Sequence, residues 1–463
     1  MKEEEKIFAG QFFCPGHPDL KAIKLRCHNL CSAYNATLED ETEKRNAIVH
    51  QIFGDFGEGS FVQGPIQIHY GTHTHIGKSF FGNFNLTIQD DAPVTIGDRC
   101  NFGPNVTIVT PVHPMLPDER QQMRDFIVNS VKYWAKEYHI DGFRFDLMAI
   151  HDTETMNQVA AELKKINPSI FVYGEGWTAG DSPLPVERRA LKENVDKMKG
   201  IAVFSDDIRD AVKGHYSNAA DRGFATGKPG NEETVKIGIV ASTAHPQVDY
   251  SKGNNSKFPY AGAPTQIINY VSCHDDLTLT DKLAKSMPGS TEAERQRAAR
   301  LAQTIVFTSQ GTPFMFAGEE IFRDKKGVHN SYKSPDSINA IDWSLKHKNA
   351  EQFDYYRELI ALRKAHPAFR MTTAEEIAKN IVFDKVDAPN VVSYSIRNNA
   401  NGDEWKEIKL VFNGSADPFV AKVPKGDWIV VARDGSLRSE GMGSSKGGNV
   451  VVPPTSALIL ARK

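Results

Sequence analysis

Apolar residues recur at every sixth position between residues 70 and 108 of this 463-residue chain. Such a repeat predicts a left-handed parallel β-helix, in which three repeats form one triangular coil and stacked coils bury a continuous aliphatic core. A generic strand-rich domain is the alternative interpretation. One series contains Tyr70, Ile76, Gly82, Ile88, Val94, Cys100 and Val106, and a second register contains Ile96, Phe102 and Ile108.

Residues 1–60, which precede the repeat, are charged and have a helical pattern of apolar positions. We expect them to form a helical cap. The β-helix is expected over residues 61–122, because a different pattern begins after that point.

Two strand patterns in the second part of the chain each lead to an acidic residue. The run from Phe143 to Leu147 contains Asp146, and the run from Ile170 to Gly174 is followed by Glu175. Carboxylates at the ends of neighbouring parallel strands can lie about 5 Å apart, the separation that a retaining glycosidase uses. An aspartate that ends a strand is otherwise most often a helix cap or a surface residue.

The surroundings of the two acids predict different roles. Asp146 follows Arg144 closely, and a nearby guanidinium favours the ionised carboxylate that a nucleophile requires. Glu175 lies between two glycines and next to Trp177, whose aromatic ring would exclude water and favour a proton donor.

A third strand pattern, Ile267 to Ser272, leads to Cys273, His274, Asp275 and Asp276. At this point GFRFDL, GEGW and VSCHD resemble three of the four short signatures of the alpha-amylase family. The residues of these three motifs are most similar to those of type I pullulanases, which cleave alpha-1,6 links in glucans. The resemblance runs from about residue 124 to residue 463 and implies a TIM barrel followed by a β-sandwich.

The same resemblance implies roles for individual residues. Asp146 would be the nucleophile, Glu175 the general acid/base and Asp275 the stabiliser of the transition state. Arg144 and His274 would contact the sugar at the cleavage point. Further candidates for sugar contacts are Trp177, Asn330, Tyr332 and Asp336, although polar loop residues are more often simply solvated.

Residues 1 to about 122 resemble maltose and galactoside O-acetyltransferases, most specifically in FGNFNLTIQDDAPVTIGD and FGPNVTIVTPVHP. The resemblance implies a homotrimer that uses acetyl-CoA, with His113 as general base and with Asn83 and Asp91 as sugar or catalytic-site contacts. A neutral imidazole can take the proton of a sugar hydroxyl as it attacks a thioester. Two departures are Pro15, where the family has an acceptor-binding aspartate, and His69, which replaces a serine.

Both resemblances are interrupted where the two patterns meet. The acetyltransferase family continues for several coils beyond the position of His113, and those coils build the acetyl-CoA groove. The pullulanase hallmark YNWGYDP and the signature of the third barrel strand are absent upstream of Asp146. The seam near Met123 has no Gly, Ser or Pro linker and passes into a helix pattern with Phe126, Ile127, Val131, Trp134 and Tyr138 on one face.

We therefore expect a mixed fold in four parts. Residues 1–60 form the helical cap, and residues 61–122 form a truncated left-handed β-helix. Residues 123–370 form a partial (β/α)8 TIM barrel, and residues 371–463, with their period-two strands, form a β-sandwich. The barrel part has about five strands. Four of them end near Asp146, Glu175, Ser205 and Asp275, and the fifth spans Ile305 to Phe316.

Composition restricts partners and location. A net charge of −3 gives no reason to expect nucleic acid or an acidic membrane surface as partner. We expect a cytoplasmic location, because no apolar run has the length of a signal peptide or membrane span. The five dispersed cysteines favour reduced thiols, and no cluster predicts a metal or calcium site.

Three hypotheses follow. The first is a retaining hydrolase, without a cofactor, that cleaves alpha-1,6 links of pullulan, glycogen or starch branches at a rate lowered by the missing strands. The second is a sugar O-acetyltransferase. The third is a fused, truncated and inactive product with unpaired strand edges.

Overall fold

A computed structural model describes residues 2–11, 13–111 and 117–463, without the side chains of residues 117–120. The chain divides into two compact units, residues 1–123 and 124–463, and each is described by itself. None of the helices among the described residues combines the length and the hydropathy that a membrane crossing requires.

Three helices begin the first unit. The longest starts at Pro18, where Nδ1 of His17 accepts a hydrogen bond from the backbone N–H of Asp19 at 3.4 Å. Cys27 and Cys31 lie on its buried face and are core residues. The helices are α1 (Glu3–Phe8), α2 (Pro18–Asn35) and α3 (Thr42–Ile52).

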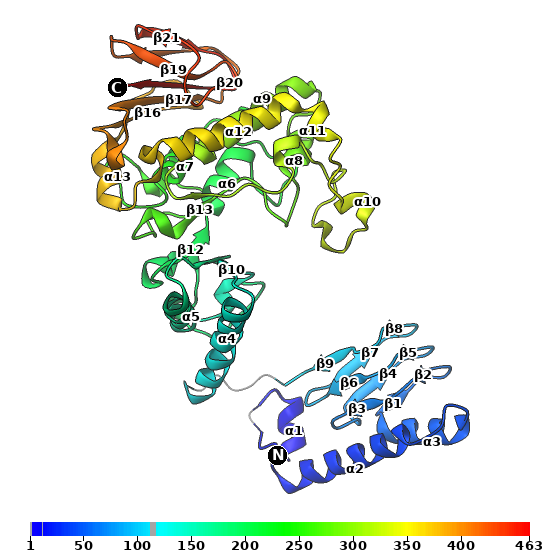
Figure 1. Ribbon diagram of the computed structural model, residues 1–463. Helices are drawn as coiled ribbons and strands as arrows, with labels where there is room; N and C mark the ends of the chain where they lie inside the picture. Colours follow the sequence, from blue (N-terminus) through cyan, green and yellow to red (C-terminus); the bar gives the residue numbers. More distant parts are fainter. Residues whose placement is uncertain (1, 12, 112–116) are drawn as a thin grey trace. The chain divides into compact units, whose positions relative to one another are not determined.

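Nine short strands follow and form three parallel sheets, ordered β1-β4-β7, β2-β5-β8 and β3-β6-β9 (Figure 1). The chain thus visits the three sheets in turn before it returns to the first, which is the arrangement of a three-faced β-helix. The left-handed sense of the coil stays a prediction. The strands are β1 (Asp55–Phe56), β2 (Phe61–Val62), β3 (Ile66–Ile68), β4 (Thr74–Ile76), β5 (Phe81–Gly82), β6 (Leu86–Gln89), β7 (Val94–Ile96), β8 (Asn101–Phe102) and β9 (Thr107–Val109).

One coil of this β-helix contains 20 residues. Three uninterrupted six-residue repeats would give a shorter coil. Asp55 pairs with His75, and the backbone N–H of Phe80 and the hydroxyl of Ser60 are likewise 20 positions apart. The partner of Ile76 is Ile96, not Val94. The residues that recur at every sixth position in the sequence therefore do not all stack on one another. At a corner of the coil, the series changes from one stack of inward side chains to the neighbouring stack.

The buried carboxylate of Asp90 holds that corner. It accepts hydrogen bonds from the backbone N–H of Tyr70 at 2.7 Å and of Gly71 at 2.8 Å, and from the hydroxyl of Thr74 at 2.8 Å. Gly71 has a φ of +76°, and a Cβ at this position would lie 2.3 Å from the carbonyl oxygen of Ile52. The longer step between β3 and β4 is thus a tight turn that the next coil stabilises.

Five parallel strands form the central sheet of the second unit, in the order β10-β11-β12-β13-β14. Each strand pairs with its neighbours in the chain, as expected for successive βα units. Within the described residues, β10 and β14 pair on one side only, so both edges of the sheet are open. The strands are β10 (Gly142–Phe145), β11 (Phe171–Gly174), β12 (Ile201–Phe204), β13 (Ile267–Asn269) and β14 (Thr312–Pro313).

Helices connect these strands and supply most of the core around them. α5 begins after Asp152, whose carboxylate accepts the N–H of Thr155 at 2.6 Å, and it buries Met156, Val159 and Leu163. The helices are α4 (Pro117–Glu137), α5 (Thr153–Ile166), α6 (Asp206–Lys213), α7 (Glu232–Ile239), α8 (Leu279–Ser286), α9 (Glu292–Thr308), α10 (Asp336–Asn339), α11 (Leu345–Lys348) and α12 (Ala350–Ala365).

Two details differ from the sequence-based expectation. In α4 the buried positions are Val128, Val131 and Ala135, whereas Phe126 is 71% exposed and Tyr138, which follows the helix, is 59% exposed. Within the described residues of the second unit, no other helix buries the side chain of Phe126. The strand expected over 305–316 is also shorter, because residues 305–308 complete α9; an apolar run suits a buried helix as well as a strand.

Antiparallel strands form the C-terminal part (Figure 1, orange to red). The period-two segments of the sequence, residues 380–386, 390–399, 407–415, 427–435 and 455–463, contain β15, β16, β17, β19 and β23. Strands β18 and β22 form a second sheet that the sequence pattern did not predict. Side chains of both sheets share one core around Trp428, so the two sheets pack as a sandwich. The elements are α13 (Ala374–Asn380), β15 (Ile381–Phe383), β16 (Val391–Arg397), β17 (Glu407–Asn413), β18 (Phe419–Val423), β19 (Trp428–Arg433), β20 (Ser436–Leu437), β21 (Ser444–Ser445), β22 (Gly448–Val452) and β23 (Ser456–Arg462).

Candidate functional site

The two acids predicted from the sequence lie together at the carboxyl edge of the parallel sheet. Phe145 at the end of β10 pairs with Gly174 at the end of β11, and its carbonyl accepts the backbone N–H of Glu175 at 3.0 Å. Asp146 and Glu175 therefore leave neighbouring strands at the same level. This is the edge at which parallel α/β sheets bind their ligands.

Arg144, from β10 itself, bridges both acids. One guanidinium nitrogen, Nη1, pairs with Asp146, and the other, Nη2, lies 2.5 Å from Oε1 of Glu175. The second oxygen of Glu175 accepts the backbone N–H of Leu147 at 2.8 Å, from a residue in the left-handed conformation with a φ of 46°. Glu175 is only 3% exposed, and each of its two carboxyl oxygens has one of these donors as partner.

His274 and Asp275 complete the group from the loop after β13. Nε2 of His274 lies 3.4 Å from Oδ1 of Asp146 and 3.6 Å from Oδ1 of Asp275. Asp146 is much more exposed than Glu175, because β10 is an edge strand in the described part of the chain. The structure thus brings Arg144, Asp146, Glu175, His274 and Asp275 to one place.

A cavity of about 420 Å³ adjoins this group. Trp177 and Asn330, two of the candidates for sugar contacts, line it, and Oδ1 of Asn330 accepts the backbone N–H of Asp276 at 2.6 Å. Tyr332, which is 76% exposed, and Asp336, at the start of α10, are not among its lining residues. The lining residues are Glu175, Trp177, Thr178, Phe204, Asp206, Arg209, Lys213, Tyr216, Tyr270, Cys273, His274, Asp275, Asp276 and Asn330.

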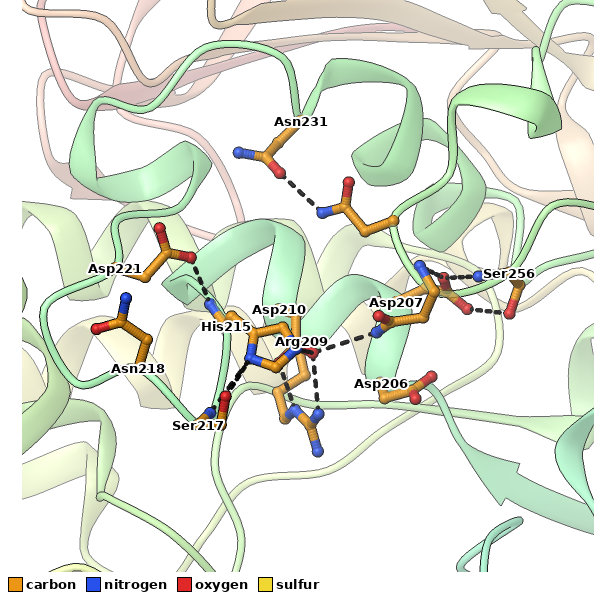
Figure 2. A network of polar contacts seen from close by, with 12 residues as sticks. Asp206, Asp207, Arg209, Asp210, His215, Ser217, Asn218, Asp221, Asn231 and Ser256 are labelled. Carbon is orange, nitrogen blue, oxygen red and sulfur yellow. Dashed lines mark hydrogen bonds and ion pairs between the residues drawn. The ribbon is translucent and has the colours of Figure 1, made fainter.

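Two basic residues of α6 in this cavity were not predicted. Arg209 makes two hydrogen bonds to the carboxylate of Asp210, at 2.7 and 3.0 Å (Figure 2), and one to the hydroxyl of Tyr270 at 3.0 Å. Lys213 is 2% exposed, and burial lowers its pKa to about 8. A sequence signal existed, because α6 directly follows the end of β12 and therefore starts at the same sheet edge as Asp146.

The ligand atoms of Asp146, Glu175 and His274 lie within 4.8 Å of one another, close enough to hold a metal ion. The guanidinium of Arg144 already contacts both carboxylates. A cation at this position opposes a metal ion by charge repulsion, so we assign no metal to the group.

In the first unit, the candidate acetyltransferase residues are described only in part. His113 lies outside the described residues. Asp91 is 5% exposed, and no protein group among the described residues donates to its Oδ2. Asn83 uses its Oδ1 to accept the backbone N–H of Phe84 at 2.8 Å.

The acetyl-CoA that the acetyltransferase resemblance implies does not fit the elements present. Strands β7, β8 and β9 are each paired on one side only among the described residues, and the next described element is helix α4. The coils that would build a groove beyond β9 are therefore not available, and we derive no step through this cofactor.

Comparisons with known proteins give a separate result for each unit. A family model described as a maltose acetyltransferase hexapeptide capping motif matches residues 6–57, and one for the all-beta domain of pullulanase matches residues 377–436. Galactoside O-acetyltransferase of Escherichia coli is 40% identical over 118 residues, which is 25% of this chain and 57% of that protein. Pullulanase of Bacillus subtilis is 37% identical over 327 residues, which is 71% of this chain and 44% of that protein.

The chain joins parts that are homologous to two different enzymes. Among solved structures, pullulanase from Bacillus acidopullulyticus is 40% identical with a TM-score of 0.69 and covers 75% of this chain. The pullulanase from Paenibacillus barengoltzii, in complex with maltohexaose and alpha-cyclodextrin, is 39% identical with a TM-score of 0.67. The chain spans 41% and 51% of these two structures, so its pullulanase-like unit corresponds to about half of a pullulanase.

Proposed function

We propose that the pullulanase-like unit, residues 124–463, binds alpha-glucans and hydrolyses alpha-1,6-glucosidic bonds by a retaining mechanism. One observation carries the proposal: Arg144 joins Asp146 and Glu175 at the carboxyl ends of neighbouring parallel strands. The ligand atoms of these two acids lie within 4.8 Å of one another, whereas an inverting enzyme needs a wider gap for a water molecule.

In this mechanism, Asp146 attacks the anomeric carbon and forms a covalent glycosyl ester, while Glu175 donates a proton to the leaving oxygen. Water then attacks the ester, and Glu175 takes the proton back. The guanidinium of Arg144 contacts the carboxylate of Asp146 and would orient it for the attack. Asp275, near His274, would stabilise positive charge on the sugar ring in the transition state.

The rate should be low, because the site is built on an open sheet. Asp146 follows the edge strand β10 and is largely exposed, so water is poorly excluded from the reacting carbon. The groups of a catalytic constellation act as a unit, and the loss of one part removes much of the rate. We expect turnover to be reduced by about 100-fold or more relative to a complete pullulanase.

The test is the release of reducing ends from pullulan by the purified full chain. Asp146→Asn should abolish the release, whereas Asp196→Asn, which changes an exposed aspartate outside the cavity, should leave it unchanged. Equal release by all three proteins would assign the signal to a contaminant. Binding of maltohexaose without any release of reducing ends would favour an inactive fused product that retains glucan affinity.

An acetyltransferase reaction remains the second candidate for the first unit, on the strength of its homology alone. Free thiol released from acetyl-CoA when maltose is added, and lost in His113→Ala, would support it. The missing coils beyond β9 lead us to expect no such release.

A further inference from the structure

Two histidines of the first unit face each other where helix α2 meets the end of strand β3. Nε2 of His28 lies 3.3 Å from Nδ1 of His69, and the two rings are tilted by 42° with their centroids 5.3 Å apart. The rings therefore meet through nitrogen atoms at their edges and do not stack. Because the two residues are 41 positions apart in the chain, the sequence pattern alone does not reveal the pair.

The distance between these histidines is set by their neighbours in the chain. The thiol of Cys27, which precedes His28, donates to the carbonyl oxygen of Ile68, which precedes His69, at 3.4 Å. The thiol of Cys31, one turn further along α2, is directed to the same oxygen at 3.9 Å. Both cysteines are buried in the core of the first unit. The two imidazoles are thus held near each other before any ligand binds.

The separation of the two nitrogens suits a shared metal ion. In tetrahedral coordination, two imidazole nitrogens that each lie about 2.0–2.1 Å from Zn²⁺ are about 3.3–3.4 Å apart. A hydrogen bond between the rings is the alternative, and in that case one of the two nitrogens carries a proton. Neutral imidazole can carry its proton on either nitrogen, so both facing nitrogens can be free to bind a metal. The charges around the pair decide between the two arrangements.

These charges favour a neutral ring and a positive ligand. Burial lowers the pKa of His69 from its ordinary value of 6.5, so the imidazole is largely deprotonated at pH 7, as a metal ligand must be. The buried carboxylate of Asp91 acts on this ring in the opposite direction, and no group among the described residues donates to its Oδ2. Such an unpaired negative charge attracts a cation. The ammonium of Lys24 opposes it, but its hydrogen bond goes to the carbonyl of Pro15 at 2.7 Å.

The ligand atoms restrict which ions fit. Imidazole nitrogens bind Zn²⁺ and neighbouring divalent transition metals, whereas Mg²⁺ and Ca²⁺ prefer oxygen ligands. In the described part of the chain, no third ligand atom from a histidine, a cysteine or an acidic residue lies within 4.8 Å of both nitrogens. Water would therefore complete the coordination. His28 is exposed to solvent, so an ion can reach the pair.

We propose that His28 and His69 together bind one divalent transition-metal ion, for which Zn²⁺ is the best fit, and that this ion links helix α2 to the β-helix. The site lies in the first unit and is independent of the glucan hydrolysis proposed for the second. A metal that binds only the folded state stabilises that state by mass action. The ion should therefore slow the local opening of α2.

The experiment counts the Zn²⁺ ions that bind to the full chain, by titration calorimetry at pH 7.5. His28→Ala and His69→Ser should each bind one equivalent fewer than the parent chain. The double variant should lose the same single equivalent, because both rings serve one ion. His50→Ala, which removes an exposed histidine of α3, is the matched control and should retain the stoichiometry of the parent chain.

Two results would overturn the proposal. An unchanged stoichiometry in either single variant would show that the rings share no ion, and a loss of two equivalents in the double variant would show two separate sites. Amide hydrogen exchange in residues 18–35 should become about 10-fold slower in the parent chain at a Zn²⁺ concentration ten times Kd, and should not respond to Zn²⁺ in His69→Ser. A circular dichroism spectrum identical to that of the parent shows that each variant is folded.

Discussion

Nη2 of Arg144 lies 2.5 Å from Oε1 of Glu175, although the two residues come from different strands. The contact is mostly buried, since the side chains are 24% and 4% exposed. Arg144 therefore holds β10 to β11 by charge as well as by the backbone ladder. Removal of either partner would leave the other side chain buried without the group that it contacts.

Arg144→Gln should destabilise the pullulanase-like unit by about 2 kcal/mol, because it leaves the buried carboxylate of Glu175 without its cation. All five tryptophans lie between residues 134 and 428, so their fluorescence during urea unfolding reports this unit alone. Arg188→Gln, at an exposed position, should have little effect. An equal loss in both variants would contradict a specific role for the bridge.

A pH dependence should come from Glu319. Burial raises the pKa of this carboxyl to about 7, from an ordinary value of 4.5. Below pH 4.5 the folded and unfolded states both hold the proton; between pH 4.5 and 7 only the folded state does. The contribution of Glu319 to stability is therefore complete at low pH and is lost as pH rises through 7, by about 3 kcal/mol in total.

The measurement compares urea unfolding at pH 5 and pH 7.5 for the parent chain and Glu319→Gln. The neutral amide should remove most of the difference between the two pH values. Glu375→Gln, which changes an exposed glutamate, should retain the full difference. A pH dependence of stability that is the same in Glu319→Gln as in the parent chain would show that Glu319 does not cause it.

Gly71→Ala should disrupt the β-helix. A Cβ at this position would lie 2.3 Å from the carbonyl oxygen of Ile52, and the φ of +76° is strained for alanine. We expect a loss of about 2–4 kcal/mol, measured as faster amide hydrogen exchange in β3, β4 and β6. Gly97→Ala, where no atom lies within 4 Å of the added Cβ, is the matched control and should preserve the exchange pattern.

The exposed aromatic side chains in α4 and directly after it should promote association of the chain. Phe126, Trp134 and Tyr138 are 71%, 43% and 59% exposed, and large exposed apolar side chains favour self-association. Phe126→Glu should lower light scattering at high protein concentration. Tyr332→Glu, at an isolated and equally exposed position, should not, and a parent chain that stays monomeric would contradict the prediction.

The parts of the fold that follow from local patterns could be predicted from the sequence. The two strands that end just before Asp146 and Glu175 could be predicted, because in each case the apolar run and the acidic residue that follows it are adjacent in the chain. Arg209 and Lys213 could have been proposed from the position of α6 directly after β12. Their exact contacts, such as that of Arg209 with Tyr270, depend on distant segments and could not.

The coil length and the exposure of α4 could not be predicted for a different reason. Ile88 and Val94 are six positions apart, so the sequence continues the period where the structure changes register. The apolar face of α4 implies a neighbour, and a helix pattern contains no information on whether that neighbour exists.

The 20-residue coil also determines how such a chain can change its length. Removal or duplication of one complete coil, for example residues 75–94, returns every later strand to its own sheet and every inward side chain to the interior. An insertion or deletion of six or twelve residues would instead stack the longer turn of one coil, such as that between β6 and β7, against a strand of the next coil. Insertions and deletions in a lineage with this unit should therefore accumulate in steps of twenty, and intermediate lengths should be rare.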